Sequence, residues 1–598
     1  MPITDFLPIS RSDLEKRGWK ALDVILITGD AYVDHPSYGA ALLGRMLESA
    51  GFKVGIIAQP DWRTTRDFLA LGRPRLFFGI TAGNLDSMVA NYTANKKLRR
   101  TDDYSPGGKI GLRPDRATIV YASRVKEVFK GAPVVIGGIE ASLRRIAHYD
   151  YWDNDVRRSI LLDSKADMLV YGMAEKQILE IANRLSAGEN IGNLDDIKGT
   201  TIARSDINFL KDYIGIHSFE EVKEDKGKFN KAFIDFYNEQ DPYRGRTVVQ
   251  KHANRFVVQL PPAMPLGTGE LSRLSALKFM RAWHPIYDKQ GGVPGFEAVR
   301  FSVISHRGCS AECNFCSLSV HQGRIIQSRS AESVLKEIED IAGQKYFRGT
   351  ITDIGGPTAN LYKAACERWT GQGACKDKNC LMPSKCQNLK LGYAETLALW
   401  ERARRIPGVK HIFIGSGMRY DLLTGKYGQE YLTTLCKYHV SGYLKVAPEH
   451  ISDPVLKLMN KTGIKSYEDF ENSFAYINKK LNKKQFLVNY FISAHPGAGL
   501  NEALTLSLHL MKKGLHPEQI QDYIPLPLTV SGAMYYTESD PFTGKRVYVA
   551  KTFKERKMQR ALLQYKNPSN RALVLEALKK LGQYEKRSLF FKDKQQER

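Results

Sequence analysis

The stretch Cys309–Cys316, CSAECNFC, places three cysteines within eight residues in the spacing Cys-x3-Cys-x2-Cys. Thiolates are the usual protein ligands of iron–sulfur clusters. Three of them can hold three irons of a cubane [4Fe–4S] cluster and leave the fourth iron open to a small molecule. The alternatives are a zinc site, a disulfide pair or buried free cysteines. Zinc fits less well, because it usually takes four ligands in CxxC pairs and this stretch holds one such pair. We predict that Cys309, Cys313 and Cys316 bind a [4Fe–4S] cluster and that His306, before them, is structural.

A regular alternation of strand and helix patterns surrounds this stretch from residue 295 to about residue 535. Six buried-strand patterns alternate with helical ones, which predicts six βα units. In α/β barrels the reactive groups lie on loops at the C-terminal ends of the strands. The cysteine loop follows the first strand, so we expect it at the active end. The predicted strands are Val299–Arg307, Gly349–Gly356, His411–Gly417, Gly442–His450, Gln485–Gly497 and Ile520–Leu528.

Residues 1–195 contain another series of buried strands separated by helices, such as the helix Tyr38–Gly51. This order predicts a doubly wound parallel α/β sheet that binds ligands at the C-terminal ends of its strands. Residues 196–294 have weaker patterns, many charges and a proline-rich segment, and we interpret them as a connecting region. The predicted strands are Asp23–Asp30, Lys53–Gln59, Arg75–Gly83, Pro133–Ala141 and Ala166–Glu175.

A second cysteine group lies in a polar insertion at residues 360–390: Cys366, Cys375, Cys380 and Cys386. A polar segment has little to bury, so a metal that staples it would explain four cysteines there. That metal would be zinc or the iron of an auxiliary iron–sulfur cluster. Reduced thiols or a transient disulfide are the alternatives. Cys436, alone in a helical pattern, is expected to be buried.

The charge balance favours polyanionic partners. The chain has 88 Lys and Arg against 64 Asp and Glu, a net charge of +24, and residues 545–598 alone hold sixteen basic and five acidic residues. RNA, DNA or an acidic surface would attract such a surplus. A solvated tail that only aids solubility is the alternative for the basic C-terminal extension at residues 536–598.

Neither the N-terminus nor any other segment has the apolar run of a signal peptide or of a bilayer span, which needs roughly 18 residues. Cysteines gathered at metal-type spacings suit a reducing compartment. We therefore expect a cytoplasmic protein that has no membrane contact.

The triplet with Phe315 before its last cysteine resembles the signature of the radical S-adenosylmethionine (SAM) superfamily, and the six βα units match its partial (β/α)6 barrel. The resemblance implies that SAM binds the open iron and is cleaved to a 5′-deoxyadenosyl radical. It places Phe315 near the adenine of SAM. It also aligns Gly355-Gly356-Pro357 with a GGE-like turn at the SAM amino group, although proline replaces the acidic residue. Other strand ends supply the remaining predicted SAM contacts: Ser416, Glu449 and His495.

The N-terminal half resembles the cobalamin-binding-type domain that often precedes such barrels. The motif of that family is Asp-x-His-x-x-Gly, whereas here Asp34 and His35 are adjacent and Gly39 lies four residues beyond His35. We therefore do not expect His35 to ligate cobalt or the domain to bind cobalamin. A scaffold or substrate-binding role is the interpretation that remains.

Longer strings are similar to the YgiQ family of radical SAM proteins: DHPSYG (Asp34–Gly39), DIGGPTANLY (Asp353–Tyr362), LKVAPEH (Leu444–His450) and QDYIPLPLTVSGAMYYT (Gln521–Thr537). Membership implies a [4Fe–4S] cluster, SAM and a reductant such as flavodoxin or ferredoxin. The substrate is not identified by the resemblance, and RNA is one candidate. The alternative is a non-catalytic iron–sulfur or zinc protein that binds nucleic acid or senses redox state. A test of SAM binding distinguishes this alternative from the enzyme.

Overall fold

The computed structural model describes residues 5–517 and 520–591. The chain divides into two compact units. Unit 1 comprises Met1–Ser310, Ser317–Lys378 and Asn388–Ile414, and unit 2 comprises Ala311–Cys316, Asn379–Gln387 and Gly415–Arg598.

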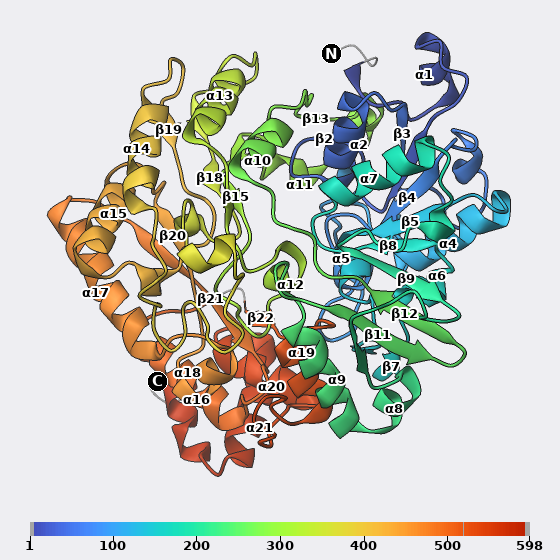
Figure 1. The fold of residues 1–598 in the computed structure, drawn as a ribbon. Helices are drawn as coiled ribbons and strands as arrows, with labels where there is room; N and C mark the ends of the chain where they lie inside the picture. The colour runs from blue at the N-terminus through green and yellow to red at the C-terminus, as the bar shows by residue number, and fades with distance from the viewer. Residues whose placement is uncertain (1–4, 518–519, 592–598) are drawn as a thin grey trace. The chain divides into compact units, whose positions relative to one another are not determined.

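Unit 1 contains a nine-stranded sheet in the order β10-β11-β12-β9-β8-β5-β4-β1-β3 (Figure 1). From β1 the chain crosses to β3 on one side and then to β4 on the other side, which makes the sheet doubly wound, as predicted. The five predicted strands pair in parallel: β1 (Val24–Thr28), β3 (Val54–Ala58), β4 (Phe77–Thr81), β5 (Val134–Gly137) and β8 (Met168–Val170).

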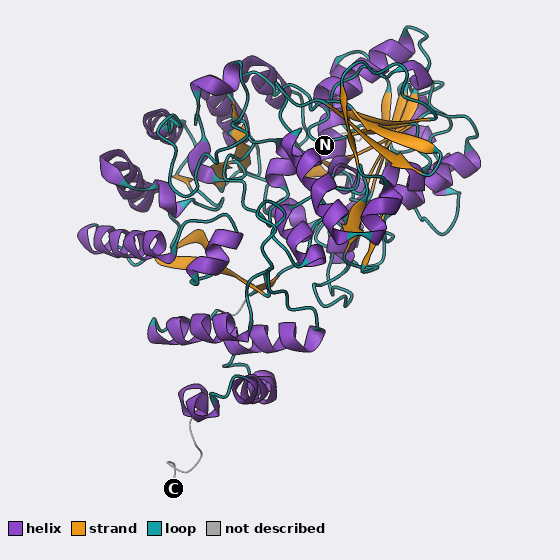
Figure 2. Cartoon of the chain, turned by 60° about the horizontal axis from the view of Figure 1, so that its bottom comes forward, coloured by secondary structure: helices purple, strands orange, loops and turns teal. Residues whose placement is uncertain are grey.

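Helices flank the strands of this sheet, as Figure 2 shows, and they form a core on each of its faces. Val24 of β1 lies in one core with α2 (Gly39–Ser49) and α7 (Glu175–Ser186). The next residue, Ile25, lies in the other core with α4 (Ala117–Val128). All five residues of β1 are buried. Burial on both faces explains why such strands read as uninterrupted apolar runs.

Residues 196–294 form more than the connecting region that we expected. Four of their strands widen the sheet: β9 (Thr200–Arg204), β10 (Tyr213–Ile216), β11 (Thr247–His252) and β12 (Arg255–Gln259). The last two form an antiparallel hairpin, and β12 pairs on its other side with β9, again antiparallel. The sequence of the hairpin strands β11 and β12 does not read as an apolar run, because exposed charged residues such as Lys251 and Arg255 interrupt it near the turn.

All six predicted barrel strands are present, as short segments. Unit 1 holds the parallel pairs β14 (Ser302–Ile304) with β18 (Asp353–Gly355) and β17 (Thr350–Ile351) with β19 (His411–Ile412). Unit 2 holds the parallel group β20 (Tyr443–Glu449), β21 (Phe486–Ser493) and β22 (Gln521–Asp522).

The basic C-terminal extension folds into helices: α20 (Phe553–Leu563), α21 (Arg571–Lys580) and α22 (Arg587–Phe590). Together with α18 (Leu500–Lys512) they enclose an apolar core that contains Leu562 and Leu578. Residues 553–590 therefore form a packed element, and the interpretation as a mere solvated tail does not hold for them.

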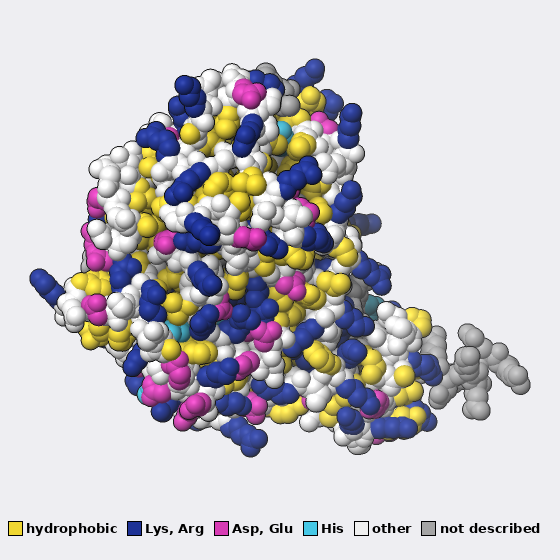
Figure 3. All heavy atoms as spheres, turned by 90° about the vertical axis from the view of Figure 1, so that its right-hand side faces the viewer, with side chains coloured by type: hydrophobic (Ala, Val, Ile, Leu, Met, Phe, Trp, Pro, Cys, Tyr) yellow, Lys and Arg dark blue, Asp and Glu magenta, His cyan; other side chains and the backbone are white. Residues whose placement is uncertain are grey.

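Charged side chains are dispersed on the surface. Figure 3 shows Lys and Arg spread over the face that it presents, with Asp and Glu between them. Across the described part of the chain, no helix combines the length and apolar character needed to cross a membrane.

Candidate functional site

Cys309, the first predicted cluster ligand, belongs to unit 1 and is anchored through its backbone. Its N–H donates to the Gly323 carbonyl at 3.0 Å. Its Sγ lies 3.9 Å from Thr358 Oγ1, within reach of a weak sulfur hydrogen bond. Thr358 directly follows the predicted Gly-Gly-Pro turn, so the first barrel strand and this turn meet at Cys309.

The turn Gly355-Gly356-Pro357 ends β18 and packs closely on the residues before Cys309. The Ser305 N–H donates to the Gly355 carbonyl at 2.7 Å. A Cβ atom on Gly356 would lie 2.7 Å from the His306 ring, so only glycine fits there. His306 is buried, with Nε2 3.0 Å from the Thr358 carbonyl, and burial lowers its pKa to about 4. It stays neutral and structural.

Cys313, the second predicted ligand, lies in unit 2 beside Arg419. The Arg419 Nη1 donates to the Cys313 Sγ at 3.5 Å. Two contacts with the Asp421 carboxylate orient this guanidinium. Nothing in the spacing of the sequence singled out Arg419, because a lone arginine in a loop carries no pattern.

The loop around Cys313 is fastened by the segment that follows α16 (Asp453–Leu458). The Asn460 side chain donates to the Glu312 carbonyl at 2.8 Å, and the Asn314 side chain donates to the Leu458 carbonyl at 2.9 Å. Glu312 adopts a positive φ of 48°. Two asparagine side chains thus fix the loop on both sides of Cys313.

Phe315 and His495 are brought together in unit 2, with ring centroids 6.0 Å apart. His495 Nδ1 lies 2.7 Å from the Pro496 carbonyl, so it donates, and Nε2 then accepts from Ser531 Oγ at 2.7 Å. Burial lowers the pKa of His495 to about 3. Both nitrogens of this neutral ring are hydrogen-bonded to other groups of the protein. The ring packs against Phe315 and so positions it.

Glu449, at the end of β20, is buried and has a φ of 68°. Burial raises the pKa of its carboxyl group, and the charges of Lys461 and Arg419 partly oppose that rise. Lys461 Nζ lies 3.8 Å from its Oε1. The neighbouring His450 is buried and accepts from the Ser452 N–H at 3.0 Å. Ser416 is half-buried, between β19 and β20 in the chain.

The second cysteine group is divided between the two units. Cys366 and Cys375 lie in unit 1, whereas Cys380 and Cys386 lie in unit 2. The Cys386 N–H donates to the Cys380 carbonyl at 2.8 Å, which closes a tight loop. A metal at this group stays a prediction. Cys436 is buried in α15 (Gly425–Tyr438), as expected, and burial raises its thiol pKa to about 12.

The donors on the triplet loop fit an iron–sulfur cluster in their chemistry. Three thiols lie on one loop, and a cationic N–H donates to Cys313, as expected for a sulfur that carries negative charge. No disulfide joins any of the eight cysteines, all of which lie in the described ranges. Over those same ranges, no three Cys, His, Asp or Glu side chains are gathered at metal-binding spacing. Ligation by the triplet therefore stays a prediction.

His35 of the DHPSYG string is buried, and each ring nitrogen has a neighbour. Nδ1 accepts from the Ser37 N–H at 3.1 Å, and Nε2 lies 3.1 Å from Arg281 Nη1. Burial and the Arg281 charge lower the pKa of His35 well below its usual value. The adjacent Asp34 pairs with Arg45. These contacts give His35 a role within the fold.

Family models match nearly the whole chain. The radical SAM N-terminal model matches residues 6–302, the radical SAM superfamily model matches residues 303–507, and a domain of unknown function, DUF3362, matches residues 518–593. Fold and cysteine loop thus define a radical SAM protein with an additional N-terminal α/β domain.

Relatives in bacteria and archaea define the family. A UPF0313 protein of Clostridium botulinum (strain 657 / Type Ba4) is 52% identical over 96% of this chain and 90% of its own length. A UPF0313 protein of Methanocella arvoryzae is 50% identical over 95% of this chain and 94% of its own length. The chain belongs to the UPF0313 (YgiQ) family.

Solved structures with low sequence identity are similar over much of the chain. The radical SAM methyltransferase TsrM from Kitasatospora setae, solved with cobalamin and a [4Fe–4S] cluster, has a TM-score of 0.48 and 15% identity over 85% of this chain and 77% of that chain. The cobalamin-dependent SAM radical enzyme OxsB has a TM-score of 0.49 and 10% identity over 96% of this chain and 77% of that chain.

Proposed function

We propose that this protein is a radical SAM enzyme that binds a [4Fe–4S] cluster through Cys309, Cys313 and Cys316 and uses it to cleave SAM. The observation that carries the proposal is the placement of the triplet directly after the first barrel strand, with Cys309 beside the Gly355-Gly356 turn. When bound and reduced by a flavodoxin or ferredoxin, the cluster would supply one electron, which breaks the C5′–S bond of SAM to give methionine and a 5′-deoxyadenosyl radical that takes a hydrogen atom from a substrate.

The protein's own residues hold the reactants in place. The backbone of the turn Gly355-Gly356-Pro357 is proposed to lie at the SAM amino group, and Gly356 lets this turn pack closely on His306 beside the cysteine loop. Phe315, supported by His495, is proposed to pack against the adenine. Glu449 at the end of β20 is proposed to accept from a ribose hydroxyl.

Electron paramagnetic resonance of the reduced, anaerobically reconstituted protein tests whether SAM binds the cluster. We expect SAM to change the spectrum of the wild-type cluster. Cys436→Ala, which removes a buried thiol outside the loop, serves as the matched control and should respond like the wild type.

Two outcomes would favour the alternative of a non-catalytic protein. A complete cluster whose spectrum ignores SAM would indicate an iron–sulfur protein that binds nucleic acid or senses redox state. Purified protein that holds zinc and takes up no iron at the triplet would indicate a zinc protein. Metal analysis of Cys313→Ala beside the wild type assigns the metal to the loop.

A further inference from the structure

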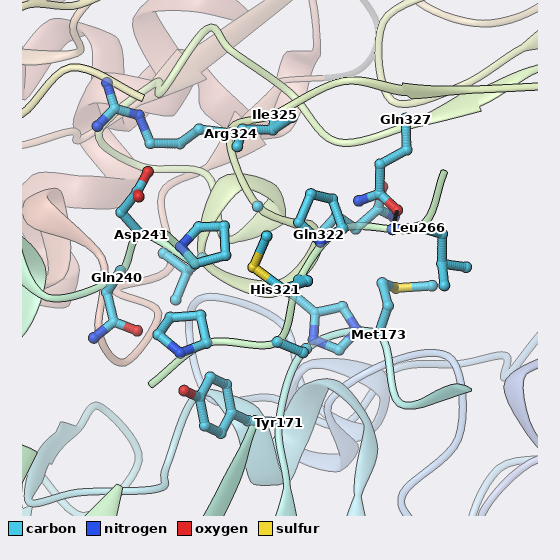
Figure 4. Close-up of a pocket in the computed structure, with 18 of the residues that line it drawn as sticks. Tyr171, Met173, Gln240, Asp241, Leu266, His321, Gln322, Arg324, Ile325 and Gln327 are labelled. Atoms are coloured by element: carbon cyan, nitrogen blue, oxygen red, sulfur yellow. Dashed lines mark hydrogen bonds between the residues drawn. The ribbon is translucent and has the colours of Figure 1, made fainter. Parts of the chain in front are cut away.

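Unit 1 contains a small cavity, with room for about 90 Å³ of water-sized molecules, that opens to solvent at the C-terminal end of β8. Figure 4 shows side chains from separate segments, among them Tyr171, Leu266 and His321, around this space. The lining comes from the β8–α7 connection, from the proline-rich segment 262–266, and from α12 (Leu318–Gln322) with the residues after it. In doubly wound sheets, ligands bind beyond the C-terminal ends of the strands.

The N-terminus of α7 faces this cavity. Its first three residues, Glu175, Lys176 and Gln177, all line the space. The N-cap, Ala174, offers no side chain to the first N–H groups. Uncapped N–H groups and the helix dipole together favour an anion at this end of a twelve-residue helix.

Gln177 is a polar side chain that the protein leaves unsatisfied. It is 2% exposed, and neither Oε1 nor Nε2 has a hydrogen-bond partner. A buried amide without partners is costly, and native proteins rarely keep one without a reason. Its place in the cavity lining supplies that reason if a ligand completes its hydrogen bonds.

Arg145 adds a positive charge beside the cavity. It is fully buried and donates to the side-chain oxygens of Gln259 at 2.7 Å and Gln240 at 2.6 Å. Its guanidinium stacks 4.5 Å from the ring of Tyr171, a lining residue. Within the described ranges Arg145 forms no ion pair, so its charge is not compensated.

The acidic residues of the lining are already neutralised or satisfied. Glu175 is paired with Arg307. Asp241 accepts from the backbone N–H groups of Tyr243 and Ala374 at 3.0 and 2.8 Å. An incoming anion therefore meets the helix terminus without an unpaired carboxylate beside it, and the Arg145 charge acts from behind the lining residues Tyr171 and Gln240.

The wall formed by α12 is hydrogen-bonded to the cysteine loop. Gln322 Oε1 accepts from the Gly308 N–H at 3.1 Å, and the Gly323 carbonyl accepts from the Cys309 N–H at 3.0 Å. Both Gln322 and Gly323 line the cavity. The cavity wall and the backbone of the first predicted cluster ligand thus share hydrogen bonds.

We propose that this cavity binds the phosphate or carboxylate group of a small organic substrate, seated on the N-terminus of α7 and hydrogen-bonded by Gln177. The identification of the ligand as substrate rests on the proposed radical SAM function, whereas the anion site itself does not.

Titration calorimetry of the full-length protein with inorganic phosphate and with acetate tests the site and separates the two anion classes. Gln177→Met keeps the shape and removes both polar atoms. We expect it to weaken binding of the preferred anion about tenfold, the value of one hydrogen bond to a charged group. Its melting temperature should stay equal or rise, because an unsatisfied buried amide is removed. Gln290→Met, at an exposed glutamine of unit 1, is the matched control and should bind like the wild type.

A merely structural Gln177 would give the opposite pattern, a lower melting temperature with unchanged anion affinity. That result, or no binding of either anion by the wild type, would overturn the proposal. Gln177→Glu provides a second variant if the methionine variant does not fold, and its added charge should abolish anion binding.

The proposal of an anion site and the proposed radical SAM function can be refuted independently of each other. Cys313→Ala should bind the anion like the wild type even though it cannot cleave SAM. Intact anion binding in a wild type that never cleaves SAM would contradict the proposed function alone. SAM cleavage by a wild type that binds neither anion would contradict the anion site alone.

Discussion

Arg419 is the residue whose contact bears most directly on cluster chemistry, because its guanidinium donates to the thiol of Cys313. Asp421 holds the guanidinium in place from the other side. Hydrogen bonds and positive charge at a ligand sulfur stabilise the electron-rich, reduced form of a cluster and raise its reduction potential. We therefore expect Arg419 to orient Cys313 and to raise the reduction potential of the predicted cluster.

Replacing Arg419 by glutamine should lower the midpoint potential of the reconstituted cluster. One hydrogen bond of about 1 kcal/mol corresponds to about 40 mV for a one-electron couple. Potentiometric titration followed by electron paramagnetic resonance measures the change. Arg419→Lys keeps the charge and should retain most of the potential, and an unchanged potential in the glutamine variant would refute the tuning role.

Among the helices, the C-terminal group provides a direct test of stability. Leu562 of α20 is fully buried in the core that α18, α20, α21 and α22 enclose. Leu562→Ala should lower the free energy of unfolding by roughly 2–5 kcal/mol, because apolar burial is reduced and a cavity is left behind. Denaturant unfolding measures it, and Leu589→Ala, at an exposed leucine of the same region, should change little. Equal effects of the two would mean that this core does not form.

The elements that the sequence predicts well are those with a strong local signal. Strands of the parallel sheet are buried on both faces and read as apolar runs, and three cysteines on one loop need no tertiary information. The hairpin β11–β12 was missed because its apolar residues are interrupted by charges, and its place in the sheet depends on pairing with β9. The packed helices after residue 545 were not predicted, because the segment was judged by its net charge and not by the spacing of its apolar residues.

The site itself could be predicted only in part. The triplet and the Gly-Gly turn come from sequence, and the packing of Gly356 on His306 supplies a physical reason for that glycine. Arg419 could not be predicted from the sequence, because its contact is with Cys313, which is distant in the chain. Gln177 could not be predicted either, because what distinguishes it is that its buried amide has no hydrogen-bond partner. Contacts of this kind depend on the folded structure.

Across the protein as a whole, several buried histidines make stability depend on pH. Burial lowers the pKa to about 3 or 4 at each of them: His148, His252, His306, His321, His450 and His495. An unfolded histidine binds a proton below about pH 6.5, whereas these folded ones do not. The unfolded state therefore takes up more protons, and the free energy of unfolding falls as the pH drops from about 6.5 toward 4.

His252→Phe should flatten this pH dependence. His252 stacks on Phe219, and neither ring nitrogen has a hydrogen-bond partner, so phenylalanine can replace it. We expect the slope of unfolding free energy to fall by about 1.4 kcal/mol per pH unit below pH 6, the value of one proton. Denaturant unfolding at several pH values measures the slope. An identical slope in the variant would show that His252 is protonated in the folded protein.

We propose RNA as a partner of the basic helices, on the strength of the net charge of +24. Lys557, Lys566 and Lys580 are exposed on or between α20 and α21. Changing all three to glutamine should reduce the salt dependence of RNA binding by about 1 for each phosphate that a lysine no longer neutralises. Filter binding at several salt concentrations measures it. The matched control changes three exposed lysines of unit 1, Lys130, Lys198 and Lys211, and an equal reduction there would refute a dedicated surface.

Release of 5′-deoxyadenosine from SAM is the most direct test of radical SAM chemistry at the triplet. The measurement uses anaerobically reconstituted, reduced protein, with Cys313→Ala and Cys436→Ala beside the wild type. We predict release by the wild type and by Cys436→Ala, and none by Cys313→Ala. Equal release by Cys313→Ala would contradict radical SAM chemistry at this loop. So would a wild type that carries a complete cluster, releases no 5′-deoxyadenosine and shows no change in the cluster spectrum when SAM is added.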